Sequence, residues 1–147
     1  MDKGAAVPLT VVAGGLIALQ APINSTLGKS IGTFAAASVS FIVGTAALVA
    51  ITVLVGGGFG DVGEARNLGL VYLTGGILGA VYVTTALVSV RVLGAGGVTA
   101  ATIAGQLSAS VVIDRFGVLG LDERPLSVQR VIGVALLAAG TFLIVQE

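Results

Sequence analysis

Long uncharged apolar stretches constrain the fold of this chain more than any other feature of its sequence. Four of them, residues 4–28, 30–60, 67–90 and 92–113, contain no charged side chain. An α-helix rises about 1.5 Å per residue, so about 20 such residues cross the roughly 30 Å hydrocarbon core of a bilayer. A fifth stretch reaches this length if its helix starts near Leu126, because Arg130 can then extend its side chain to the headgroups. We therefore expect an all-α polytopic membrane protein with five transmembrane helices.

The charged residues and glycines between these stretches set the predicted helix boundaries. The five helices are expected at about residues 7–27, 33–55, 68–89, 93–113 and 126–145, in a single transmembrane domain of residues 1–147. The first stretch is longer than the apolar region of about 7–15 residues in a signal peptide, so we expect it to remain as a span. The composition agrees with a lipid environment, since 56% of the residues are hydrophobic and 10% are charged.

The residue types that are missing exclude several classes of function. The sequence has no cysteine and no histidine, which excludes disulfide bonds and the zinc sites built from these residues. Its formal net charge is zero and no basic stretch is interleaved with aromatic residues, so nucleic acid is not an expected partner. No pair of nucleophile and base and no metal-ligand cluster is visible. We expect no enzymatic activity, no cofactor and no bound metal.

The distribution of Lys and Arg predicts the orientation in the membrane. With five spans, five cations lie on the side of the N-terminus: Lys3, Arg66, Arg115, Arg124 and Arg130. The other side has two, Lys29 and Arg91. Because cytoplasmic loops carry the excess of Lys and Arg, we expect the N-terminus in the cytoplasm.

Two amides in the first predicted helix are candidates for a site inside the membrane. Gln20 and Asn24 lie one turn apart on one helix face, and Pro22 between them leaves a backbone carbonyl without its usual donor. This arrangement can coordinate a polar solute. Hydrogen bonding between helices explains the amides equally well, and a kink at Pro22 is tolerated in membrane helices.

Tyrosines and glycines share one stripe of the third predicted helix. Tyr72, Gly75, Gly79 and Tyr82 follow at spacings of three, four and three residues. The stripe can form a cavity wall with an aromatic ring at either end, or a close helix contact through the two glycines. We favour packing for Gly75 and Gly79 and a place in the cavity for Tyr82. Tyr72 is either a gating residue or an anchor at the membrane interface.

The fourth predicted helix has two neighbouring ridges. Every fourth residue of the first ridge is small, which allows another helix to pack closely: Gly97, Ala101, Gly105 and Ala109. The second ridge lies about 100° around the helix and is polar: Thr102, Gln106, Ser110 and Asp114. One side of this helix is thus expected to pack against a helix, and the other to face water or solute.

Asp114 ends the polar ridge at the predicted membrane boundary, where it has two interpretations. A partly buried carboxylate can carry protons or act as a gate in a transport cycle. Beside Arg115, and shortly before Gly117, it can instead form a solvated ion pair at the end of the helix. The sequence alone favours the ion pair.

Four short motifs resemble those of a known family. They are Gly105-Gln106-Leu107, Ile113-Asp114-Arg115-Phe116-Gly117, the pair Gln20 and Asn24, and Gly75-Gly76 followed by Gly79. With these motifs the chain resembles the bacterial YdcZ family, a half-size branch of the drug/metabolite transporter (DMT) superfamily, over essentially its whole length. Arg115 departs from the pattern, because many members are expected to have His there.

The resemblance implies a transporter in the bacterial inner membrane whose five spans are one inverted-repeat half of a ten-helix unit. The partner is then an antiparallel second copy, inserted with dual topology, or a homologous five-span chain. This agrees with the difficulty of enclosing a solute pathway with five short helices.

Alternating-access transport of a small metabolite or drug-like solute is therefore the leading hypothesis. The expected solute contacts are Gln20, Asn24, Tyr82, Thr102 and Gln106, and the expected coupling or gating residues are Asp114 and Tyr72. A small dual-topology ion channel and a non-transporting membrane assembly subunit are the alternatives.

Overall fold

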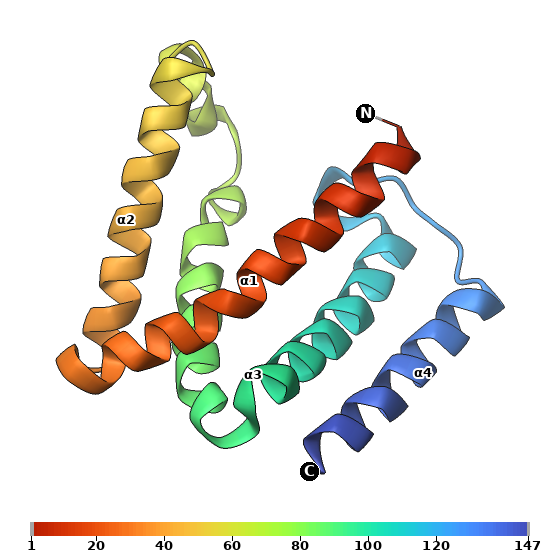
Figure 1. The fold of residues 1–147 in the computed structure, drawn as a ribbon. Helices are drawn as coiled ribbons and strands as arrows, with labels where there is room; N and C mark the ends of the chain where they lie inside the picture. Colours follow the sequence, from red (N-terminus) through yellow and green to blue (C-terminus); the bar gives the residue numbers. More distant parts are fainter. Residues whose placement is uncertain (1, 147) are drawn as a thin grey trace. The chain divides into compact units, whose positions relative to one another are not determined.

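The computed structural model describes residues 2–146, which form helices and connecting turns without a β-strand (Figure 1). In this part of the chain four α-helices follow one another: α1 (Lys3–Ile31), α2 (Thr33–Leu54), α3 (Gly75–Phe116) and α4 (Val128–Val145). Short 3₁₀ helices lie in the connections: η1 (Gly60–Asn67), η2 (Leu70–Leu73) and η3 (Val118–Gly120). The chain divides into two compact units, unit 1 with residues 1–91 and unit 2 with residues 92–147.

Unit 1 begins with a helical hairpin whose connection is a single glycine. Asp2 caps the start of α1, where its carboxylate accepts a hydrogen bond from the Ala5 N–H at 2.8 Å. Gly32 lies between α1 and α2 with φ 91° and ψ 152°, a conformation that residues with a Cβ rarely adopt. Glycine at this position therefore allows α2 to start directly after α1 ends.

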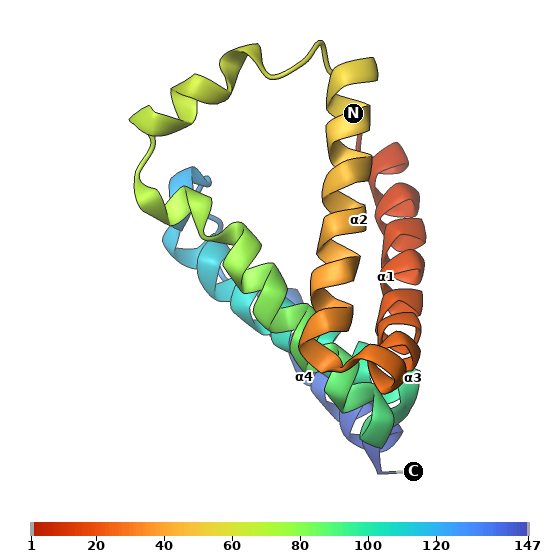
Figure 2. The same cartoon turned by 90° about the vertical axis from the view of Figure 1, so that its left-hand side faces the viewer.

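The buried residues of unit 1 gather near this hairpin turn. α1, α2 and the first part of α3 come together there and diverge away from it (Figures 1 and 2). Farther from the turn, large side chains such as Leu16, Ile42 and Ile77 are more than half exposed. The buried apolar side chains of α2 and α3 in this unit are Ala36, Ala37, Val83, Ala86 and Leu87. The alanines among them let the helices approach closely.

A break inside α3 limits the length of each of its helical parts. The 42 residues of α3 are interrupted at Gly94, where φ is 67° and ψ is 173°. These angles lie outside the helical region and are accessible almost exclusively to glycine. Gly94 therefore separates a first helical part, residues 75–93, from a second part, residues 95–116.

Unit 2 consists of the second part of α3 and helix α4, which lie side by side (Figure 1). Thr141 Oγ1 on α4 donates a hydrogen bond to the Ala100 carbonyl oxygen at 3.1 Å. Nearby, a Cβ at Gly97 would lie 3.7 Å from Val145 Cγ2, an ordinary van der Waals distance between the two helices. At its other end α4 is capped by Ser127, whose hydroxyl accepts a hydrogen bond from the Arg130 N–H.

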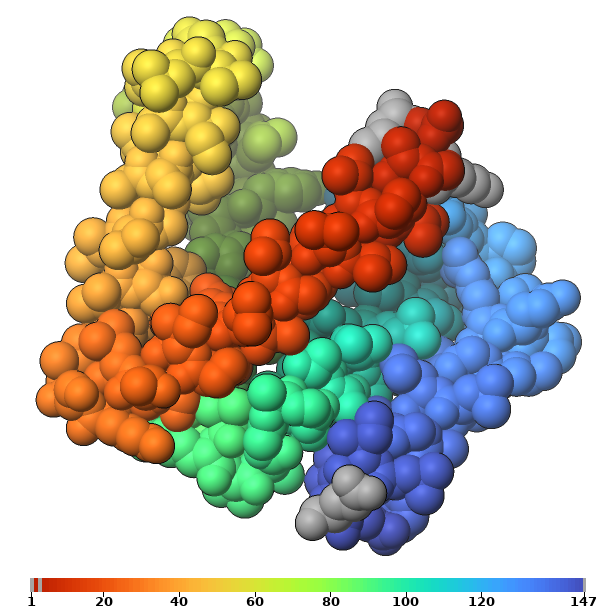
Figure 3. Space-filling view, viewed as in Figure 1, coloured from red at the N-terminus to blue at the C-terminus, as the bar shows by residue number. Residues whose placement is uncertain are grey.

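The exposed surface of the helices is largely apolar, which suits a lipid environment. Figure 3 shows one face of α1 turned toward the viewer with nothing in front of it. On this helix Val7, Leu9, Val12 and Leu16 are each at least 60% exposed. In the described residues four helices are long and apolar enough to cross a membrane. The prediction of an all-α polytopic membrane protein is confirmed, and the count of five spans stays a prediction.

The observed helix boundaries differ from the expected ones at two places. α1 continues to Ile31, because Gly32 rather than Gly28 provides the break. The helix expected from residue 68 is preceded by η2, and α3 begins at Gly75. Tyr72 therefore lies in η2, and its expected place on one α-helical stripe with Gly75 is wrong. A 3₁₀ helix has three residues per turn rather than 3.6, so the α-helical spacing does not extend through it.

Candidate functional site

A buried amide links α1 and α2 near the hairpin turn of unit 1. Asn24 on α1 is 4% exposed, and its Nδ2 donates a hydrogen bond to Ser40 Oγ on α2 at 3.2 Å. Polar groups buried in a membrane protein cost free energy unless they find partners, and this bond provides one. Asn24, an expected solute contact, thus lies in the only region of unit 1 where described polar side chains are buried.

An arginine joins α3 to the same region of α1. Arg91 Nε donates a hydrogen bond to Ser25 Oγ at 3.1 Å, and Ser25 is 5% exposed. Gly28 provides room for the guanidinium, since a Cβ at this position would lie 3.0 Å from Arg91 Nη2. We call Asn24, Ser25, Ser40 and Arg91 the polar cluster. It ties three helical segments together at one end of unit 1.

The other expected solute contacts of unit 1 have intermediate exposure. Gln20 lies one turn before Asn24 on α1 and is half-buried. Tyr82 on α3 is also half-buried and precedes the buried Val83. Tyr72 differs from both, because it is 52% exposed in η2. Gln20 and Tyr82 are thus partly shielded, whereas Tyr72 is open to its surroundings.

Two glycines of α3 that are expected to pack against a helix have different surroundings. A Cβ at Gly79 would lie 3.3 Å from Phe41 Cζ, so α2 and α3 approach closely at this point. At Gly75 a Cβ would meet no described atom within 4 Å apart from the backbone of its own helix and its chain neighbours. A packing role for Gly75 stays a prediction.

The polar ridge of unit 2 lies on the second part of α3 and is mostly exposed. Thr102 is half-buried, while Gln106 and Ser110 are exposed. These side chains are accessible to solvent, to a solute or to a partner. Their role in solute binding stays a prediction.

Asp114 forms an ion pair, but with a different arginine from the expected one. Its Oδ2 lies 3.1 Å from Arg130 Nη1, and each side chain is about one-third exposed. The Asp114 carbonyl oxygen also accepts a hydrogen bond from the Arg124 N–H at 2.7 Å. Consecutive residues of a helix point about 100° apart, which is why Arg115 does not face Asp114. The expected pairing with Arg115 is wrong, and the actual pair links the end of α3 to the first turn of α4.

A comparison with protein families identifies the kind of protein that carries these sites. The family model described as "Putative inner membrane exporter, YdcZ" matches residues 5–143, almost the entire sequence. The chain belongs to the YdcZ family. Comparisons with curated proteins and with solved structures gave no match.

Membership of the YdcZ family agrees with the apolar helices. Together they make this chain a multi-pass protein of the inner membrane, in a family whose description is that of an exporter. The resemblance seen in the sequence is confirmed.

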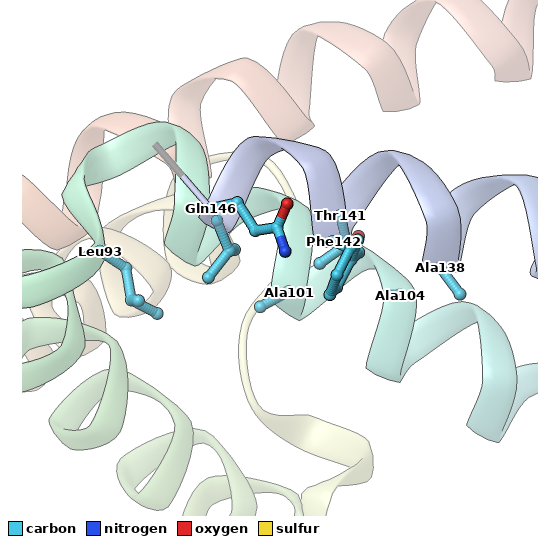
Figure 4. Close-up of a pocket in the computed structure, with 8 residues that line it drawn as sticks. Leu93, Ala101, Ala104, Ala138, Thr141, Phe142 and Gln146 are labelled. Atoms are coloured by element: carbon cyan, nitrogen blue, oxygen red, sulfur yellow. The ribbon is translucent and has the colours of Figure 1, made fainter.

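Unit 2 of this YdcZ chain also has an open groove between α3 and α4 (Figure 4). Its volume is about 460 Å³, and its lining is nearly all apolar. Figure 4 shows Ala101 and Ala104 on α3 facing Thr141 and Phe142 on α4. Because Thr141 already donates its hydroxyl to a backbone carbonyl, the groove offers little to a polar solute. It borders the small-residue ridge rather than the polar ridge.

Sequence reasoning missed several members of these contacts. Arg91 was counted only as a charge flanking a helix, and Ser25 and Ser40 were not noted, although the structure joins Arg91 to Ser25. The signal for Ser25 was its position beside Asn24, in the polar end of an otherwise apolar helix. No local signal pairs Arg91 with Ser25, because the contact depends on how far α3 is shifted along α1.

Proposed function

We propose that this YdcZ chain is one half of an inner-membrane exporter that moves a small solute by alternating access. The observation that carries the proposal is the burial of Asn24, at 4% exposure, beside hydroxyl groups of two helices inside apolar segments. Polar side chains inside membrane spans are costly and mark solute pathways when they converge. The family description as an inner membrane exporter supports the same function.

The length of α3 supports five membrane spans. A continuous helix of 42 residues would be about 63 Å long, roughly twice the hydrocarbon thickness. Divided at Gly94, each part has about the length of one span, and α1, α2 and α4 supply three more. With five spans, the excess of Lys and Arg on the N-terminal side supports a cytoplasmic N-terminus.

In this proposal each unit has solute contacts of its own. In unit 1 they are Gln20, Asn24 and Tyr82, and in unit 2 they are Thr102 and Gln106. The partial burial of Gln20, Tyr82 and Thr102 supports such a role, because these groups are shielded from bulk water but remain accessible. The exposed Gln106 can reach a solute held between this chain and a partner.

Asp114 and Tyr72 have gating roles in the proposal. The ion pair of Asp114 with Arg130 joins the two helices of unit 2 at one end, and its opening would separate them there. Tyr72 lies in the 3₁₀ segment before α3, where a ring can move without disturbing an α-helix.

A partner completes the pathway in this proposal, either an antiparallel second copy or a homologous five-span chain. Small residues along α3 leave room for such a partner, because a Cβ at Gly75 or Gly105 would meet no described atom within 4 Å apart from the backbone of its own helix and its chain neighbours. Inverted repeats that meet at the membrane midplane are a common design of transporters. The helix-packing residues of unit 2 are Gly97, Ala101, Gly105 and Ala109.

The test uses export from intact cells, because the solute is unidentified. Cells that express the chain are grown on uniformly ¹³C-labelled glucose, and labelled compounds in the medium are measured by mass spectrometry. We expect at least one small labelled solute to accumulate, and its release to fall with Asn24→Ala and Gln106→Ala.

Ser38→Ala is the matched control for this test, because the Ser38 hydroxyl donates only to the Phe34 carbonyl of its own helix. Each variant must reach the membrane in the same amount. Equal release by cells with and without the chain, or unchanged release by both site variants, would contradict the proposal.

A further inference from the structure

The polar cluster contains one formal charge, and it is positive. Arg91 is the only ionisable residue among its members. In the described part of the chain the one ion pair joins Asp114 to Arg130, so no carboxylate neutralises Arg91. The acids of unit 1 lie elsewhere, at the start of α1 and in η1. The cluster therefore has an uncompensated cation, the exposed Arg91, beside the buried side chains of Ser25 and Asn24.

The two serines of the polar cluster differ from four hydroxyl residues whose side chains bond to their own helix. Four others donate to the carbonyl oxygen four residues earlier in their own helix: Thr10, Ser38, Thr52 and Ser108. Among the described residues, Ser25 and Ser40 instead accept hydrogen bonds, from Arg91 and Asn24 respectively. Each hydroxyl proton of Ser25 and Ser40 is therefore available for another acceptor.

The guanidinium of Arg91 has further donors available. Its Nε–H binds Ser25, while its terminal nitrogens make no hydrogen bond with a described residue. Gly28 holds open the space in which Nη2 lies. A guanidinium that one hydrogen bond already holds in place loses less conformational entropy than a freely moving one when its remaining N–H groups bind a carboxylate or phosphate.

These donors have a common chemical consequence. Arg91, Ser25 and Ser40 all have N–H or O–H groups to donate, and Arg91 carries the only formal charge in the cluster, which contains no carboxylate. We propose that the polar cluster binds the carboxylate or phosphate group of an anionic solute, with Arg91 as its ion-pairing residue. The inference rests on the proposed function in one respect, since it assigns this anion to the exported solute.

The test measures the electrostatic preference of the cluster without requiring transport. The chain has no cysteine, so Ser40→Cys introduces a single thiol next to Asn24. Its reaction rates with a sulfonate-bearing and a trimethylammonium-bearing methanethiosulfonate are compared with those of a free thiol in solution. We expect the thiol in the protein to favour the anionic reagent by about tenfold relative to the free thiol.

Substitutions of two cations distinguish the effect of Arg91 on the reagent preference from the effect of other positive charge near the cluster. We expect Arg91→Gln to abolish the preference and Arg91→Lys to retain it. Lys29→Gln is the matched control, because Lys29 lies in the last turn of α1 beside Gly28, and we expect it to leave the preference largely unchanged. Each variant is checked for monodisperse elution in detergent. Absence of any preference in the folded Ser40→Cys protein, or equal effects of Arg91→Gln and Lys29→Gln, would overturn the inference.

A second arm distinguishes a free anion from a lipid headgroup. We expect inorganic phosphate or succinate to slow the modification of Ser40→Cys in phosphatidylcholine nanodiscs, whereas sodium chloride at equal ionic strength does not. Protection by phosphatidylglycerol alone would overturn the assignment to the solute. Anion preference without any export of labelled compounds would leave the site standing and remove the proposed function. Export without anion preference would leave the proposed function standing and overturn the anion site.

Discussion

The polar contacts between helices are arranged differently inside unit 1 and inside unit 2. In unit 1 the polar contacts between helices lie at one end, where Asn24 binds Ser40 and Arg91 binds Ser25. In unit 2 they lie at both ends of a helix pair, with Thr141 bound to a backbone carbonyl at one end and Asp114 paired with an arginine at the other.

This difference indicates which unit has binding capacity left over. The groups that join the two helices of unit 2 satisfy each other, since the charges of Asp114 and Arg130 cancel and the Thr141 hydroxyl donates to a carbonyl. The contacts of unit 1 leave hydroxyl and guanidinium donors available. We therefore assign solute binding chiefly to unit 1 and a supporting role to the contacts of unit 2.

The largest expected effect on stability comes from Gly94, the glycine that separates the two parts of α3. Gly94→Ala places a Cβ on a residue with φ 67° and ψ 173°, which should cost about 1–3 kcal/mol. The matched control is Gly96→Ala, because Gly96 is helical and a Cβ there would meet no described atom within 4 Å apart from its own helix backbone and chain neighbours. Thermal unfolding in detergent measures both. Equal stability of the two variants would contradict a break in α3 that requires glycine at residue 94.

The contact between Arg91 and Ser25 should have the next largest effect. A hydrogen bond to a charged group contributes about 1.5 kcal/mol, so a double-mutant cycle of Arg91→Gln and Ser25→Ala should give a coupling of that size. Denaturation in mixed detergent measures the coupling. Additive effects of the two substitutions would show that the contact does not hold α3 to α1.

Thr141→Val should have a smaller effect on the helix pair of unit 2. It removes a hydrogen bond between helices, and such bonds contribute on average about 0.6 kcal/mol in membrane proteins. Thermal unfolding should therefore occur at a slightly lower temperature. A loss of stability as large as that of Gly94→Ala would mean that this hydrogen bond contributes far more to unit 2 than the average bond between membrane helices.

The ion pair of unit 2 should have the smallest effect. Asp114 and Arg130 are each about one-third exposed, so solvent screens them and Asp114→Asn should cost roughly 0.5 kcal/mol. This cost should decrease with added salt. Asp122→Asn is the control, since Asp122 is exposed in the loop before α4. A cost that is large and independent of salt would contradict the comparison of the units.

The sequence predicted the parts of this account that depend on local pattern. Apolar stretches and their lengths gave the all-helical membrane fold, and the spacing of Gln20 and Asn24 indicated a polar face on the first helix. The motifs around Gln106 and Asp114 indicated the family. These features need only the periodicity of a single helix.

Contacts between helices were not predictable in the same way. The partner of Asp114 is Arg130, sixteen residues later in the chain, and the nearer Arg115 misled because adjacent helical residues point in different directions. The contact of Arg91 with Ser25 likewise depends on the register between two helices. A sequence shows which residues share one helix face, but the facing residue of the neighbouring helix is set by packing.

The most direct test compares one hydrogen bond from each unit in the export assay. Asn24→Ala and Thr141→Val each remove a side-chain hydrogen bond between helices, one in the polar cluster and one in unit 2. The account predicts that Asn24→Ala lowers export of the labelled solute per folded molecule by about tenfold, whereas Thr141→Val leaves it unchanged. Equal export by the two variants would contradict the assignment of solute binding to the polar cluster.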